Sequence, residues 1–159
     1  MPGQLKTEIK QQRTFSKPQE EVLLSILRTA DQLALPLHGV LRKVHLSFSQ
    51  YNVLRILRGA GKEGLPCGEI SERMIRRDPD LTRLLDRLES RELVGRSRGT
   101  TDRRVVQATI TTNGLALLES LDDPIEATLD KTLSHMTRKR LNLLCELLEE
   151  ARGVLKDAK

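Results

Sequence analysis

PDLTRLLDRLESRELVGRSRGTTDRRVVQATIT, residues 79–111, changes its periodicity half-way along. In the first half, leucines recur at the i, i+3, i+4, i+7 spacing that places one apolar stripe on a helix. These leucines are Leu81, Leu84, Leu85 and Leu88. The second half contains two short β-like runs, 92–97 and 103–110, joined by a loop with a glycine in it. The stretch therefore predicts a helix followed at once by a β-hairpin.

The face of this helix opposite the leucines carries side chains that form hydrogen bonds: Thr82, Arg83, Asp86 and Arg87. Arg83 and Arg87 lie one turn apart, so both could reach guanine edges, although ion pairs along the same helix would use the same groups. The cations of the hairpin are Arg96, Arg98, Arg103 and Arg104, and Asp102 is the only acid near them in sequence. A polar helix beside an arginine-tipped hairpin predicts a DNA-binding surface, with the hairpin cations on the backbone or in the minor groove.

The positive charge of the chain is concentrated around this stretch. The formal net charge is +5 and the sequence pI is about 9.5. Residues 76–110 contain nine arginines against six carboxylates, whereas residues 111–159 contain seven cations against nine acids. A localised basic surface favours a polyanionic partner. On charge alone, an ordinary solvated basic face is an equally good explanation.

The composition favours helices packed on helices. Apolar residues make up 38% of the chain, aromatic residues only 2%, and tryptophan is absent, so leucine, isoleucine, valine and alanine must form the core. With 159 residues, the chain is long enough for one domain or for two small fused lobes.

Several features of the sequence point to the cytoplasm. The two cysteines, Cys67 and Cys145, lie far apart, which does not fit a disulfide framework and is typical of a reducing compartment. The first residues are polar and lack the apolar core of a signal peptide. Because no apolar run approaches about 18 residues, we expect no membrane span.

The rest of the chain predicts two regions around the opening stretch. Residues 1–15 have no strong pattern and suggest an N-terminal extension, after which Ser16 is the expected N-cap of a long helix. Short helices at 50–58 and 67–74 precede the leucine-striped helix and complete a helix-turn-helix. We therefore expect a mainly α fold with a small β-hairpin wing. A winged helix-turn-helix lobe at 47–111 is flanked by helical regions at 16–46 and 112–157.

The flanking helical regions have apolar faces too wide for so small a lobe to cover. This predicts a two-fold homodimer in which the N- and C-terminal helices of two chains interlock. The symmetry would present two recognition helices to half-sites about 34–36 Å apart on one face of a duplex.

Five segments of the sequence follow one another in a characteristic order. They are LSFSQYNVL at 46–54, GEISER at 68–73, LTRLLDRLE at 81–89, LV at 93–94 and DRRVVQATITTNG at 102–114. Together they resemble the MarR family of winged-helix transcriptional regulators, whose wing carries an Asp-x-Arg motif that runs into an LT-x-x-G helix start. The resemblance covers about residues 16–157.

The resemblance implies an obligate dimer that binds palindromic operators in double-stranded DNA, most often as a repressor released by a small molecule or an oxidant. Arg104 matches the wing arginine that enters the minor groove, and Asp102 matches the acid that orients the wing tip. Thr82 and Arg83 match recognition-helix positions that face the major groove.

Two positions depart from the pattern of the family. Glu92 stands where the family usually has the glycine that forms a left-handed cap at the helix end. The segment Ile75-Arg76-Arg77-Asp78 replaces a small, polar turn before the recognition helix.

Three residues are candidates for regulation. His38 and Tyr51 could line an effector cavity, which in this family lies between the dimer helices and the winged lobe, although packing or surface roles would also account for them. Cys67 stands at an expected helix N-terminus, where a thiolate is favoured. Redox sensing through Cys67 is therefore an alternative to release by a ligand, and a purely structural cysteine is a third possibility.

The sequence contains no GxSxG, Walker A or HExxH motif, and its three histidines lack the spacing of a metal site. We expect no enzymatic activity, no cofactor and no bound metal. The sequence predicts a dimeric DNA-binding regulator. A winged-helix protein-interaction module is the alternative from another class, but it would have no reason to concentrate arginines at a hairpin tip.

Overall fold

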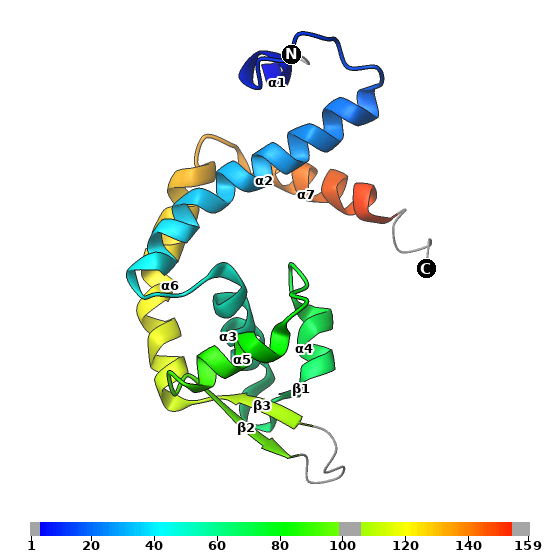
Figure 1. Ribbon diagram of the computed structural model, residues 1–159. Coiled ribbons are helices and arrows are strands. Elements are labelled where there is room, and N and C mark those ends of the chain that lie inside the picture. Colours follow the sequence, from blue (N-terminus) through cyan, green and yellow to red (C-terminus); the bar gives the residue numbers. More distant parts are fainter. Residues whose placement is uncertain (1–3, 99–105, 154–159) are drawn as a thin grey trace.

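The computed structural model describes residues 4–98 and 106–153. A winged lobe lies below an arm made of long helices (Figure 1). The arm consists of α2 (Pro18–Lys43), α6 (Thr112–Leu133) and α7 (Arg138–Gly153), with a short α1 (Gln4–Glu8) before it. The lobe consists of α3 (Phe48–Ala60), η1 (Gly61–Glu63), β1 (Leu65–Pro66), α4 (Cys67–Arg73), α5 (Leu81–Glu89), β2 (Val94–Arg98) and β3 (Val106–Ile110). This mainly α fold with a small antiparallel sheet confirms the predicted class.

The hydrophobic core fills the winged lobe and continues into α6. Its fully buried side chains come mainly from α3, α4, α5 and the sheet, and α2 and the first half of α6 each add one. All four leucines of the predicted α5 stripe are buried, so the interpretation of this helix as half-buried is confirmed. The largest fully buried side chains are Leu41, Leu54, Leu57, Ile70, Leu85, Leu88 and Leu118.

The wing is part of a three-stranded antiparallel sheet with the strand order β1-β3-β2. The predicted hairpin is present, with Val94 opposite Ile110 and Arg98 opposite Val106. The two residues before α4 form strand β1, in which Leu65 pairs with Ala108. Gly64 makes this pairing possible: its φ is +67°, and a Cβ atom there would lie 2.4 Å from the Ala108 carbonyl oxygen.

One expectation for the N-terminal part of the chain is wrong. Ser16 is not the N-cap of α2, because Lys17 holds that position and Ser16 instead donates from its backbone N and its Oγ to Glu20 Oε2, both at 2.9 Å. Residues 4–8, which lie within the expected N-terminal extension at 1–15, form helix α1. Leu5 is buried there, and Glu8 forms an ion pair with Arg28 of α2 at 3.2 Å.

Three helices are followed, two or three residues after their last residue, by a left-handed residue that is not glycine: Lys10, His45 and Glu92, with φ of +52°, +55° and +56°. At the end of α5, Glu92 N donates to Glu89 O at 2.8 Å and Leu93 N donates to Leu88 O at 3.0 Å. This pair of bonds is the Schellman motif, in which glycine is the usual left-handed residue. The departure seen at Glu92 in the sequence therefore corresponds to a strained cap.

Replacing Glu92 by glycine is expected to stabilise the fold. A side chain in the left-handed region costs about 1–2 kcal/mol, and part of the gain is offset by the greater freedom of glycine in the unfolded chain. We expect the free energy of unfolding to rise by about 1 kcal/mol in urea denaturation at one fixed protein concentration. Glu92→Ala keeps the Cβ atom and is the matched control. An equal gain in Glu92→Ala would show that the charge, and not the backbone, is responsible.

Candidate nucleic-acid interface

Helix α5 presents a polar face to solvent because its leucines turn the opposite face into the core. Thr82, Arg83, Asp86 and Arg87 are all exposed. Asp80 is the N-cap and accepts a hydrogen bond from Arg83 N at 3.3 Å. The same carboxylate lies 3.2 Å from Arg83 Nε, while the Arg83 side chain stays 78% exposed. The Arg83 guanidinium is thus held at the start of the helix and remains open to a ligand.

Arg96 has a different environment from the one expected. Its guanidinium lies 2.7 Å from Asp86 Oδ1, and its Nε donates to Glu89 Oε2 at 2.9 Å. The expectation that Asp102 is the only acid near it is therefore wrong. The Arg96 side chain is only 25% exposed, and it ties strand β2 to helix α5. Asp86 and Arg96, both predicted as DNA contacts, hold the recognition helix and the wing together.

The Arg96–Glu89 contact shifts the proton affinity of both groups. The hydrogen bond from Arg96 holds the pKa of the Glu89 carboxyl below its ordinary value. The same bond raises the pKa of Arg96. Both groups therefore remain charged across the neutral range.

The hydrogen bond between Arg96 and Glu89 should make the stability of the fold depend on pH. A carboxylate whose pKa is lowered by folding stabilises the fold above its unfolded pKa, and this contribution is lost as the pH falls through the folded pKa. We expect wild type to be more stable than Glu89→Gln at neutral pH, with the difference shrinking below about pH 4. Urea denaturation across this range measures it. Arg96→Gln removes the same bond and should show the same narrowing, so a difference that stayed constant with pH would contradict the assignment.

Two further arginines connect the winged lobe to the arm. Arg91, at the end of α5, donates to the carbonyl oxygens of His45 at 2.7 Å and Val44 at 3.0 Å, which are exposed acceptors at the end of α2. Arg58 of α3 donates to both carboxylate oxygens of Asp122 in α6, at 3.1 and 2.9 Å. Sequence reasoning missed both contacts, since the partners lie 46 and 64 residues apart.

The wing is described along its two strands. Arg98 ends β2 opposite Val106 of β3. Asp102, Arg103 and Arg104 lie outside the residues that the structure describes. Their roles stay predictions.

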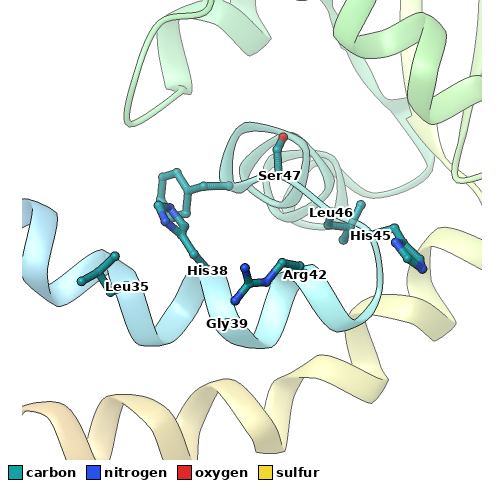
Figure 2. Close-up of a pocket in the computed structure, with 8 residues that line it drawn as sticks. Leu35, His38, Gly39, Arg42, His45, Leu46 and Ser47 are labelled. Carbon is teal, nitrogen blue, oxygen red and sulfur yellow. The ribbon is translucent and has the colours of Figure 1, made fainter.

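A crevice of about 520 Å³ lies where α2 meets the start of α3. His38 and Arg42 project into it from α2, whereas His45 follows the helix end (Figure 2). The His38 and Phe48 rings meet edge to face, with centroids 6.2 Å apart. Tyr51, expected beside His38, belongs instead to the buried core, and the Arg55 guanidinium lies 5.8 Å from the centre of its ring.

Cys67 is the first residue of α4, and its thiol donates to the Val106 carbonyl oxygen of β3 at 3.8 Å. It is half-buried, whereas Cys145 is exposed on α7 rather than part of the core. A redox role for Cys67 stays a prediction. Within residues 4–98 and 106–153, no group of three or more His, Cys, Asp or Glu side chains could hold a metal ion. No helix in this part of the chain is long and apolar enough to cross a membrane.

Comparison with known proteins identifies the family to which this chain belongs. The sequence profile of the MarR family matches residues 46–106, which span α3 to the first residue of β3. The crystal structure of a MarR transcription factor from Planctomyces limnophilus is 37% identical, covers 86% of this chain and 98% of its own, and superposes with a TM-score of 0.65. The chain belongs to the MarR family.

Two further proteins are similar to this chain at lower identity. The HTH-type transcriptional regulator MhqR of Bacillus subtilis (strain 168) is 28% identical over 109 residues, 69% of this chain and 74% of that protein. BpsR of Bordetella bronchiseptica, whose DNA binding is regulated by 6-hydroxynicotinic acid, is 21% identical. It covers 89% of this chain and 97% of its own, with a TM-score of 0.76. The chain is therefore a MarR-family transcriptional regulator with a DNA-binding winged helix.

Proposed function

We propose that the protein is a homodimeric repressor that binds a palindromic operator through α5 and the wing of each protomer. The observation that carries the proposal is the exposed polar face of α5, on which Arg83 stands open to solvent beside its N-cap. Thr82, Arg83 and Arg87 lie where a recognition helix reads base edges in the major groove. Asp86 and Arg96 are assigned a positioning role instead.

The arm supplies the dimer interface of this proposal. Apolar side chains on α2, α6 and α7 are more than half exposed in the single chain, and a soluble monomer rarely leaves so many uncovered. Two-fold pairing of the arms would bury them and would place the two α5 helices on one face of a duplex. These side chains are Val22, Leu23, Leu27, Leu129, Leu143 and Leu147.

The wing tip completes the DNA contact in this proposal. By resemblance to the family, Arg104 enters the minor groove and Asp102 orients it, while Arg98 and Arg103 neutralise backbone phosphates. The contacts of Arg96 with the carboxylates of α5 hold the base of the wing against the recognition helix. The base of the wing therefore fixes the direction in which the wing tip extends.

The effector of this proposal binds in the crevice beside His38. Arg42 supplies a permanent positive charge there, and the apolar wall of Leu35 and Phe48 suits a flat ring. A small aromatic carboxylate fits both features, and 6-hydroxynicotinic acid, which regulates the DNA binding of BpsR, belongs to this chemical class. The crevice adjoins the junction of arm and lobe. A ligand bound there would therefore favour one orientation of α5 relative to the arm over another.

The test is the selection of bound duplexes from a random pool, with and without aromatic carboxylates. We expect enrichment of inverted half-sites about one helical turn apart, with an affinity that falls steeply as salt rises. Release of the selected duplex by 6-hydroxynicotinic acid, weakened in Arg42→Ala, would support the effector site. A flat salt response with no enriched sequence would instead favour the protein-interaction module.

A further inference from the structure

The turn between α4 and α5 exposes three consecutive side chains. Ile75 is 74% exposed, the most exposed large hydrophobic residue in the described part of the chain, and Arg76 and Arg77 beside it are also exposed. The turn is held at both ends, because Met74 before it and Leu81 after it are buried in the core. An isoleucine and two arginines are thus displayed from an anchored segment.

The backbone of this turn is fixed by a buried amide. Asn52 of α3 is the buried polar residue of the described core, and its Oδ1 accepts a hydrogen bond from Ile75 N at 2.9 Å. A buried amide is costly unless it is hydrogen-bonded, so this contact specifies the path of the chain at Ile75. Asp78 Oδ1 accepts from Asp80 N at 3.0 Å and closes the other half of the turn. Arg76 and Arg77 are therefore exposed on a turn whose backbone is fixed by hydrogen bonds.

The carboxylates of the turn are already engaged. Asp78 accepts the Asp80 backbone N–H, and Asp80 caps α5 and pairs with Arg83. Among the residues that the structure describes, neither Arg76 nor Arg77 forms an ion pair. A shallow crevice of about 360 Å³ runs from Asp78 past Arg83 and Arg87 to the start of α3, so the turn and the polar face of α5 belong to one surface.

We propose that this turn is a second DNA contact, in which Arg76 and Arg77 bind backbone phosphates at the rim of the major groove and Ile75 packs on the adjoining sugar. The inference rests on the proposed function. A duplex carries one negative charge per about 1.7 Å of its axis, so phosphates are spaced closely enough for two adjacent arginines. Such contacts set affinity and register without reading sequence.

The experiment compares salt dependence in Arg76→Gln/Arg77→Gln and in wild type. The probes are a duplex selected by the wild-type protein and an unrelated duplex of the same length. We expect the slope of log affinity against log salt to become shallower by about 0.9 for each phosphate that the variant no longer neutralises, equally on both duplexes. Arg76→Lys/Arg77→Lys keeps the charges and should retain the wild-type slope. Lys139→Gln/Arg140→Gln, which removes the same charge from exposed positions on α7, should also retain it.

The outcomes separate this inference from the proposed function. Suppose that wild type binds with a steep salt dependence, and that the glutamine variant has an unchanged melting temperature and the same slope. The turn contact is then refuted, while the operator-binding function stands. Weaker binding confined to the selected duplex would also refute it, because phosphate contacts do not discriminate sequence. A flat response in wild type itself would remove the proposed function and this inference with it.

Discussion

Replacing Leu23 and Leu27 by aspartate is expected to leave the chain monomeric and to weaken its binding to a two-half-site duplex by about two to four orders of magnitude. Both leucines lie on α2, and their exposed fractions in the single chain are 58% and 57%. In the proposed dimer they are covered by the partner, where an unpaired carboxylate is strongly disfavoured. A monomer also loses the avidity of two recognition helices on one duplex. Sedimentation and fluorescence anisotropy measure the two effects.

Gln32→Asp is the matched control for this prediction. Gln32 is exposed on the side of α2 opposite Leu23 and Leu27, so a negative charge is added to the same helix away from the apolar face. It should remain dimeric and bind DNA as wild type does. A dimeric Leu23→Asp/Leu27→Asp protein would show that the arms pair through another surface.

Replacing Arg83 by alanine is expected to weaken binding to the selected operator by about one to two orders of magnitude and to relax its preference at one base pair in each half-site. The reason is that a bidentate arginine–guanine pair is worth about 1–3 kcal/mol of discrimination. The fold should be retained because Asp80 keeps its capping bond to the backbone N–H of residue 83. Repeating the selection with the variant shows which base pair becomes degenerate.

Arg83→Lys separates base reading from charge. Lysine keeps the positive charge but lacks the planar fork of arginine, so specificity should fall while most of the salt dependence remains. An Arg83→Lys protein that selects the wild-type operator with undiminished preference would assign Arg83 to a phosphate instead. Arg138→Ala, which removes one exposed cation from the first turn of α7, is the control for net charge alone.

The parts of the fold that local periodicity controls could be predicted from the sequence. The spacing of Leu81 and its partners defined the buried face of α5, and with it the exposed face that carries Arg83. The hairpin followed from two short β-like runs joined by a loop with a glycine: β2 spans Val94–Arg98 where 92–97 was expected, and β3, described over Val106–Ile110, lies within the expected 103–110. Ser47 and Gln50 form a capping box that starts α3 two residues earlier than the apolar pattern alone suggested.

The contacts that depend on chain reversal could not be predicted in this way. Arg96 meets Asp86 and Glu89 because the left-handed turn at Glu92 folds β2 back along α5, and no periodicity connects residues on either side of such a turn. β1 is only two residues long and becomes a strand through its pairing with β3. Tyr51 illustrates the same limit, since its burial in the core depends on how α3 packs and not on its neighbours in sequence.

The three left-handed residues that are not glycine each cost the fold some stability. Lys10, His45 and Glu92 lie at the ends of different helices, so glycine substitutions there should have additive effects on unfolding, about 1 kcal/mol at each site. His45 differs from the other two because it borders the proposed effector crevice and its carbonyl oxygen accepts from Arg91. A glycine would relieve the backbone there but remove an imidazole from the crevice. Selection for a regulated repressor would thus retain strain at His45 that selection for stability alone would eliminate.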